Sequence, residues 1–378
     1  MFSIERKKII EKLSLVSGVV GLKSPREILR QVLFVVGQEK IVLKGTNLEN
    51  SIVTELEPIS VSNAEMFTIS PVKLLEILKL LKEEVISFKL KGDTSLFIDA
   101  GSGVFELATG HAEDFPKIPE INPEQELVIE GSELKKAFNY TEYSTSSETH
   151  RYAMTGIQFN FESDNITFVT TDAKRMTVYH SSIKTPSSLA SSKQKKGGNN
   201  IVVPKMALAN FIKSITDVTK AVNIGIKDNM IKFTYNKDQL FATLLEGEIP
   251  DYKSIIPAEY KNTAELERTN SIDAVKKILV TAIDKEKEME LILSSEGIQF
   301  ISETPTIGKS EVEVKGNYKG SNMSLLINPI YLLDPMKVLS EENVKILLNG
   351  DESPFLITNT EGTFKSLIMP LEKMKEAE

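Results

Sequence analysis

Residues 70–110 read SPVKLLEILKLLKEEVISFKLKGDTSLFIDAGSGVFELATG, and two later segments repeat their plan. These are residues 203–247, VPKMALANFIKSITDVTKAVNIGIKDNMIKFTYNKDQLFATLLEG, and residues 328–370, NPIYLLDPMKVLSEENVKILLNGDESPFLITNTEGTFKSLIMP. Each has a proline near its start, then apolar residues at helical spacing, then alternating strands separated by turn residues. Pro71, Pro204 and Pro329 are 133 and 125 residues apart, which predicts a threefold internal repeat.

A second, weaker triplet precedes these segments. Residues 3–13, 131–138 and 271–283 predict amphipathic helices with Ser3, Ser132 and Ser271 as N-caps, and strand pairs follow each. The pattern therefore predicts an α+β chain of three repeated domains, each made of two helix-plus-strands halves. We expect the domains at residues 1–124, 125–257 and 258–378; three unrelated α+β domains are the alternative. Pro335 should kink or shorten its predicted helix.

Composition restricts the class of protein. The chain has 378 residues, of which 41% are hydrophobic and 26% charged, as in folded proteins of several domains. No apolar run approaches the roughly 18 residues of a membrane span, and the N-terminus lacks the apolar core of a signal peptide. The chain has no cysteine, which excludes disulfides, thiolate metal sites and cysteine nucleophiles. These features fit a cytoplasmic location.

Charge is segregated between the predicted elements. The six predicted helices together carry a formal charge of +8, whereas the whole chain carries −8, so the remainder carries −16. Basic helices gathered on one surface would attract phosphates. The alternative is that lysine is simply a good helix former on solvated faces. The lysines of residues 185–200, TPSSLASSKQKKGGNN, leave the same choice open between a solvated linker and a DNA contact.

Motifs for catalysis are scarce. The three histidines, His111, His150 and His180, have no metal-ligand spacing, and the chain contains no phosphate-binding glycine loop and no G-x-S-x-G elbow. We therefore expect no catalytic residue, no metal and no cofactor. A hydrolase that uses paired carboxylates, such as a glycosidase, and a β-rich scaffold module remain alternatives. Beside turns, Asp114, Asp172 and Asp251 are expected to accept hydrogen bonds from backbone amides.

Five stretches, in order along nearly the whole chain, resemble the bacterial sliding clamps, the β subunits of the replicative DNA polymerase. EDFPKIP at 113–119 resembles the family's A-D-F-P, and RYAMTGI at 151–157 resembles R-Y-x-L-N-G-M/V. VTTDAKRM at 169–176 resembles V-A-T-D-G-H-R-L, and IPDYKSIIP at 249–257 resembles F-P-D-Y-x-x-V-I-P. SLIMPL at 366–371 resembles the closing V-V-M-P-M.

The resemblance implies a fold and a function. Two copies would form a head-to-tail dimeric ring of clamp domains, with helices lining a hole for duplex DNA and sheets forming the outer wall. Such a ring tethers the replicative polymerase and confers processivity without catalysis. The implied partners are duplex DNA, contacted independently of sequence, the polymerase catalytic subunit, the clamp loader, and other polymerases and repair proteins; no membrane is implied.

The resemblance also implies functional residues. Positions that contact DNA in the family fall on Lys23, Lys73, Glu148, Tyr152, Ala153, Lys205, Asn328 and Tyr331. Two of them depart from the family pattern, because Glu148 has the wrong charge for a phosphate and Ala153 replaces an aromatic residue. The family's apolar cleft for partner peptides, between the second and third domains, implies Met154, Thr171, Ala173, Lys174, Arg175, Met176, Pro250, Ile255, Leu367, Met369, Pro370 and Leu371.

The dimer interface implied by the family falls on Phe105 and Leu107 of the first domain and on Asp284 and Lys285 of the third. Asp284 and Lys285 replace apolar family residues, which predicts a more polar interface. Glu372 takes a place that is usually basic, and the chain continues past it as KMKEAE. We expect this tail to lie near the cleft.

Overall fold

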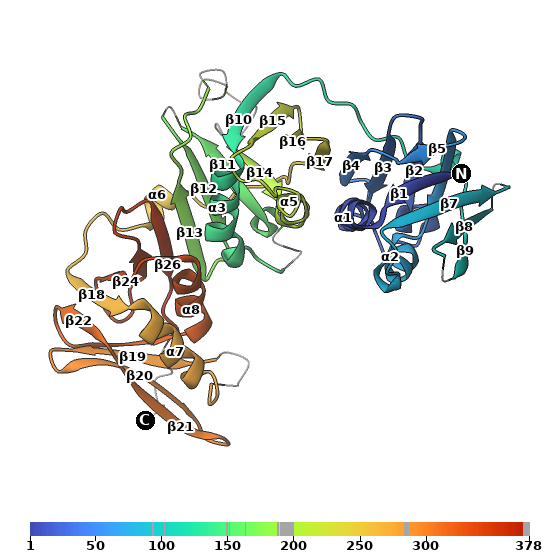
Figure 1. Cartoon of the computed structure of the whole chain (residues 1–378). Coiled ribbons are helices and arrows are strands. Elements are labelled where there is room, and N and C mark those ends of the chain that lie inside the picture. The colour runs from blue at the N-terminus through green and yellow to red at the C-terminus, as the bar shows by residue number, and fades with distance from the viewer. Residues whose placement is uncertain are drawn as a thin grey trace. The chain divides into compact units, whose positions relative to one another are not determined.

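The computed structural model describes residues 1–92, 94–101, 103–148, 150, 152–162, 164–186, 189, 200–282 and 287–372. Its contacts divide the chain into two compact units, each described by itself below. One unit consists of Met1–Lys135 and Val203–Leu245, and the other of Lys136–Val202 and Glu246–Glu378. Figure 1 shows the elements in chain order. No helix in the described part of the chain is long and apolar enough to cross a membrane.

The elements follow the same order three times. The first series is β1 (Phe2–Glu5), α1 (Arg6–Ser17), β2 (Val32–Val36), β3 (Ile41–Thr46), β4 (Asn50–Leu56), β6 (Glu65–Ile69), α2 (Pro71–Leu80), β7 (Val85–Lys91), β8 (Ser95–Asp99) and β9 (Val104–Ala108). The second series is β10 (Gln125–Glu130), α3 (Gly131–Thr141), β11 (Gly156–Phe161), β12 (Ile166–Thr171), β13 (Arg175–His180), β14 (Asn200–Pro204), α5 (Lys205–Ile212), β15 (Ala221–Lys227), β16 (Met230–Tyr235) and β17 (Asp238–Thr243).

The third series is β18 (Asn262–Glu267), α7 (Arg268–Ile278), β19 (Met289–Ser294), β20 (Gly297–Thr304), β21 (Gly308–Val314), β23 (Met323–Ile327), α8 (Pro329–Val338), β24 (Asn343–Leu348), β25 (Phe355–Thr358) and β26 (Phe364–Ile368). Short elements between these are β5 (Ser60–Val61), α6 (Tyr252–Ile255), β22 (Gly316–Lys319) and the 3-10 turns η1 (Glu27–Arg30), η2 (Ala112–Asp114), η3 (Glu142–Ser144) and η4 (Tyr152–Thr155). The predicted α+β repeat of helix-plus-strands halves is confirmed.

One backbone hydrogen bond recurs in all three series. The first amide of each series' first helix donates to the carbonyl just before the strand that follows the second helix: Arg6 to Glu84 at 2.7 Å, Gly131 to Lys220 at 2.9 Å, and Arg268 to Glu342 at 2.8 Å. The strand before each helix ends in a glutamate and runs directly into the helix. The repeat is therefore visible at the level of single backbone bonds, although the side chains differ.

This geometry makes the serine N-cap predictions wrong. Ser3 lies in β1, Ser132 lies inside α3, and Ser271 lies inside α7, where its hydroxyl donates to the Glu267 carbonyl at 2.8 Å. The helices start up to three residues away from the predicted caps because each preceding strand runs directly into its helix. The carbonyl beside the neighbouring strand accepts a hydrogen bond from the first amide of the helix. Pro335 does not end α8, which continues to Val338.

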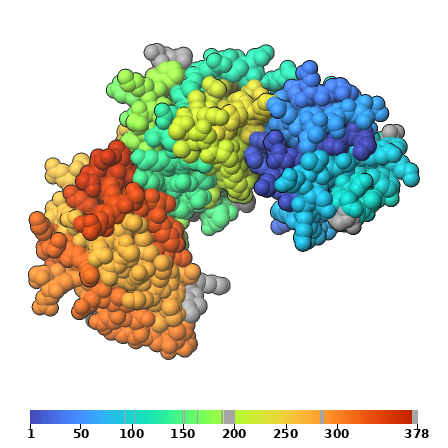
Figure 2. All heavy atoms as spheres, in the orientation of Figure 1, coloured from blue at the N-terminus to red at the C-terminus, as the bar shows by residue number. Residues whose placement is uncertain are grey.

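The sheets cross the boundaries between the series. Their strand orders are β5-β1-β7-β8-β9, β10-β15-β16-β17-β4-β3-β2-β6, β14-β11-β12-β13-β26-β25-β24-β18-β22 and β21-β20-β19-β23. Thus β17 pairs with β4 inside one unit, and β13 pairs with β26 inside the other. Figure 2 shows red atoms of the C-terminal segment against green atoms of the middle series, and in this unit β26 pairs with β13.

Alternating burial explains why these segments are strands. The side chains of β16 alternate between half-buried and buried from Met230 to Tyr235, as expected when one face of a sheet covers a core. In the first series the core contains stacked rings, with Phe2 and Phe88 centroids 5.0 Å apart and Phe34 and Phe67 centroids 5.1 Å apart. Burying each such ring stabilises the fold by roughly 2–3 kcal/mol.

Candidate functional site

The turn between β12 and β13, together with the strand residue on either side of it, carries four of the predicted cleft residues and is fixed by its own polar groups. The Thr171 hydroxyl donates to the Arg175 carbonyl at 2.7 Å and accepts from the Ala173 amide at 3.0 Å. The Asp172 carboxylate accepts from the amides of Lys174 and Arg175, at 3.0 and 2.9 Å. The turn is thus held by side chains, as predicted for Asp172.

The C-terminal strand brings the other end of the sequence to this turn. In the pairing of β13 with β26, Met176 lies opposite Leu367, and the Met369 amide donates to the Lys174 carbonyl at 3.0 Å. Thr171, Met176 and Leu367 are buried, whereas the Met369 side chain is 41% exposed. An exposed apolar side chain therefore stands two residues after buried Leu367, just past the end of β26.

The remaining predicted cleft residues lie on separate elements. Pro250 and Ile255 are exposed on the segment around α6, Met154 is half-buried in η4, and Pro370 and Leu371 are half-buried just after β26. The α6 segment is capped by Asp251, which accepts from the Lys253 amide at 3.1 Å. This confirms the predicted turn role of Asp251. Among the twelve predicted residues, those of the β12–β13 turn and of β26 are joined directly.

Arg175 serves as a structural cross-link as well as a predicted cleft residue. Its guanidinium lies 2.8 Å from Asp334 and 3.0 Å from Asp172, donates to the Tyr143 carbonyl at 2.6 Å, and lies over the Tyr331 ring at 4.5 Å from the centroid. Burial alone would lower the pKa of Arg175, but the two carboxylates outweigh it and raise that pKa. The side chain is only 9% exposed, so little of it remains for a ligand.

Sequence reasoning missed two members of this cluster. Asp334 lies in α8 and Tyr143 in η3, far from Arg175 along the chain. Burial raises the pKa of the Tyr143 hydroxyl, which donates to Ser366 at 3.1 Å and accepts from Thr177 at 2.9 Å. A half-buried tyrosine with a polar partner on β26 could not be inferred from local pattern, because the partner lies 223 residues away.

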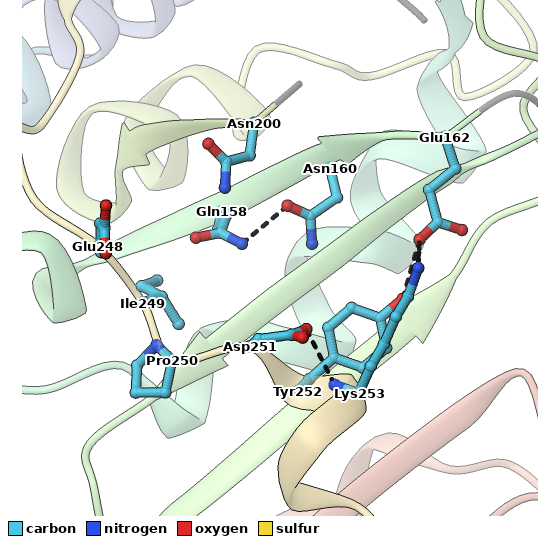
Figure 3. A pocket seen from close by; sticks show the side chains of 10 residues that line it. All are labelled: Gln158, Asn160, Glu162, Asn200, Glu248, Ile249, Pro250, Asp251, Tyr252 and Lys253. Atoms are coloured by element: carbon cyan, nitrogen blue, oxygen red, sulfur yellow. Dashed lines mark hydrogen bonds and ion pairs between the residues drawn. The ribbon is translucent and has the colours of Figure 1, made fainter. Parts of the chain in front are cut away.

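A polar pocket of about 650 Å³ lies beside α6, with only Pro250 in common with the predicted cleft (Figure 3). Gln158, Asn160 and Glu162 line it from β11 and the residue that follows, at the alternate positions that face away from the core. Glu162 accepts from Tyr252 at 3.0 Å and pairs with Lys253 at 2.8 Å. Burial would raise the pKa of Glu162, but the bonds from Lys253 and Tyr252 lower it overall.

The predicted DNA-contacting residues lie in different settings. Lys23 and Lys73 are exposed, and Lys73 pairs with Glu76 at 2.9 Å on α2. Lys205 is half-buried at the start of α5, and Tyr152 is 47% exposed. Glu148 is exposed, with His150 at 3.4 Å.

Two of these positions have structural roles, and a third is buried. Asn328 caps α8 by accepting from the Ile330 amide at 2.9 Å, and Tyr331 packs against Arg175. Ala153 is 7% exposed, so its side chain offers little surface to any ligand.

The predicted interface residues Phe105 and Leu107 lie on β9, which is an edge strand within the described residues. Phe105 is 36% exposed and Leu107 is half-buried. Asp284 and Lys285 lie outside the described residues, as do Lys193, Lys195 and Lys196. In the described part of the chain, no group of histidine and acidic side chains could hold a metal ion.

Profiles of one protein family match three successive parts of the chain. The DNA polymerase III beta subunit N-terminal domain matches residues 1–119, the central domain residues 128–251, and the C-terminal domain residues 253–372. The chain belongs to the DNA polymerase III β-subunit family. It is 24% identical to the beta sliding clamps of Pseudomonas putida, over 371 residues, and of Bacillus subtilis, over 382 residues. Each match covers 98% of this chain and 99% of the relative.

Solved β-subunit structures have the same fold. The DnaN sliding clamp from Pseudomonas aeruginosa bound to griselimycin superposes with a TM-score of 0.89 at 24% identity, and the β subunit from Thermotoga maritima with 0.88 at 18% identity. Both matches cover 98% of this chain and 99% of the other. The chain has three clamp domains and acts as a DNA sliding clamp, a non-catalytic processivity factor of DNA polymerase III. Neither the hydrolase nor the scaffold alternative finds support in these relatives.

Proposed function

We propose that two copies of the chain close head to tail into a ring around duplex DNA and tether the polymerase catalytic subunit to it. One observation carries the proposal. Each series has two halves: β4, β13 and β21 are the last strands of the first halves, and β9, β17 and β26 are the last strands of the second halves. Inside the chain, β4 pairs with β17 and β13 pairs with β26. Among the described residues, β21 and β9 are the two last strands that lack such a partner. Pairing them between two copies closes the ring and removes both edges.

Duplex DNA would be held by topology, with sequence-independent contacts from basic side chains. Lys23 and Lys73 are exposed, and the repeated helices of the sequence carry a net positive charge. Lysine contacts with phosphates do not distinguish bases, so the ring can slide. The proposed domains are residues 1–124, 125–257 and 258–378, and the proposed location is the cytoplasm.

Partner proteins would bind through short peptides at the cleft formed around the β12–β13 turn and β26. The exposed Met369 side chain, next in sequence to the strand that pairs Leu367 with Met176, supports this assignment, because a flexible thioether adapts to different apolar anchors. The clamp loader, other polymerases and repair proteins would compete for this cleft with the replicative polymerase.

Retention on circular DNA tests the proposal. The chain is loaded onto a nicked circular plasmid with its clamp loader and ATP and passed through a sizing column, and the plasmid is then linearised. We expect co-elution with the circle and release after linearisation, because only a topological link depends on closed DNA. Loss from both forms, or equal retention on both, would contradict the ring.

A further inference from the structure

The register of the repeats can be followed from strand to strand with the printed sequence. Each first helix is preceded by a glutamate, and these three glutamates lie opposite Val85, Ala221 and Asn343. Two residues further along, those strands carry Ser87, Asn223 and Lys345. From each of these residues, the antiparallel register identifies the opposite residue on the next strand and then on the strand after it. The three paths are Ser87–Asp99–Val104, Asn223–Thr234–Gln239 and Lys345–Thr358–Lys365. Val104, Gln239 and Lys365 therefore occupy the same place in their series.

The two junctions inside the chain show which residues lie opposite this position. Gln239 lies opposite Val53 where β17 joins β4, and Lys365 lies opposite Val178 where β26 joins β13. The same counting in the first and third series identifies the residue of β21 that corresponds to Val53. Ile69 and Ile327 each stand two residues before a helix proline and lie opposite Val32 and Met289. The residues that follow Val32 and Met289 are Leu33 and Glu290. Across the sheet, Leu33 lies opposite Lys44, which lies opposite Val53, and Glu290 lies opposite Ile301, which lies opposite Glu311. Glu311 therefore occupies the place of Val53.

We propose that β9 of one copy pairs antiparallel with β21 of a second copy, with Val104 opposite the partner's Glu311. This inference rests on the proposed ring and adds its register. Phe105 then faces the partner's Ser310, Glu106 faces the partner's Lys309, and Leu107 faces the partner's Gly308. Glu106 and the partner's Lys309 form an ion pair that selects this register.

The faces of the two strands agree with this register. Phe105 lies opposite buried Ile98 within its own sheet, and Ser310 lies opposite buried Ser302, so both belong to core-facing positions. Glu106 and Lys309 belong to the outward positions and are exposed. Directly opposed residues of paired strands share a face, whereas a shift by one residue would oppose core-facing to outward positions.

The charges distinguish this junction from the two internal ones. At the place of Glu106 the internal junctions have Phe241 and Leu367, and at the place of Lys309 they have Ser51 and Met176, all of them buried. Among these three junctions, only the proposed pairing of β9 with β21 has oppositely charged residues at these two positions. Lys309 already lies 3.4 Å from Glu311 of its own strand, so the arriving Glu106 would add a second carboxylate to it. Pairing β9 with another β9 would bring the Glu106 side chains of two copies together, which like charges disfavour.

Cysteine pairs test the register, since the chain has no cysteine of its own. One variant combines Glu106→Cys with Lys309→Cys, and the matched control combines Glu106→Cys with Glu311→Cys. Opposed residues have Cα atoms about 4.5–5.5 Å apart, within disulfide range, whereas a shift by two places them about 7–8 Å apart. Under mild oxidation we expect rapid covalent dimers from the first variant and slow ones from the control. A control as fast as the first variant, or cross-linking by Glu106→Cys alone, would overturn the register.

Charge reversal tests the ion pair. Glu106→Lys and Lys309→Glu should each weaken the dimer about tenfold or more, because each acts at both junctions of the ring, and the double variant should recover most of the loss. Lys89→Glu, on β7 away from the edge, should leave the dissociation constant unchanged. Sedimentation measures it. A wild-type monomer would overturn the proposed ring and the register together, whereas a wild-type dimer that the double reversal fails to restore would overturn only the ion pair.

Discussion

The carboxylate of Asp334 lies 2.8 Å from the guanidinium of Arg175, 159 residues earlier in the sequence. Their side chains are 21% and 9% exposed, so the pair is largely withdrawn from water. It connects α8 to the β12–β13 turn, which carries predicted cleft residues. The proposed cleft would thus be supported by a charge pair whose members belong to different repeats.

Removing one member of this pair should destabilise the fold. We expect Asp334→Asn to lower the free energy of unfolding by about 2–4 kcal/mol, because Arg175 would stay buried with less compensation. Urea unfolding measures the change. Asp273→Asn is the matched control, since Asp273 pairs with Lys276 at 3.3 Å and both are 59% exposed. The control should change stability by less than about 1 kcal/mol, and equal losses in both variants would contradict a special role for Arg175.

His180 should make stability depend on pH. Burial, with Lys365 nearby, lowers the pKa of His180 below its usual value. The unfolded chain therefore binds a proton more readily, so this contribution is complete above about pH 6.5 and is lost as the pH falls below it. We expect His180→Gln to lose less stability than the wild type between pH 7.5 and pH 5.5 in urea unfolding. Parallel curves for the wild type and His180→Gln would refute the effect.

Ala173 should be better replaced by glycine. Its φ of 72° lies in the left-handed region, at the position where the family pattern V-A-T-D-G-H-R-L has glycine. Because a Cβ atom is disfavoured there, Ala173→Gly should stabilise the chain by about 0.5–1 kcal/mol. Ala221→Gly, at an exposed and extended position of β15, should destabilise it by a similar amount. Thermal unfolding compares the two, and a loss at both positions would show that the backbone at Ala173 is not strained.

Met369 should dominate peptide binding at the cleft. In fluorescence polarisation with a labelled peptide that carries leucine and phenylalanine anchors, Met369→Ala should weaken binding about tenfold or more. Met66→Ala on β6, where the side chain is 60% exposed, is the matched control and should bind like the wild type. Unchanged affinity in Met369→Ala would move the peptide site elsewhere.

Sequence reasoning predicted the repeat and its helices because proline, apolar spacing and alternation are local signals. It failed at the ends of helices, where Ser3 and Ser271 were assigned as caps, because the first amide is accepted by a carbonyl more than seventy residues away in sequence. Arg175 was assigned to the cleft by resemblance, but its partners Asp334 and Tyr143 depend on tertiary packing and carry no local signal. Strand pairing across repeats also has no local signature, since any exposed edge can accept any strand.

The strands shared across the repeats determine where the chain can be divided. Sequence suggests cutting at the boundaries between repeats, yet a fragment containing only the first repeat would lose the neighbour of β4, and one containing only the third would lose the neighbour of β26. The middle repeat would lose both, and its two halves already belong to different compact units. The duplicated segment is therefore a unit of ancestry rather than a unit of folding.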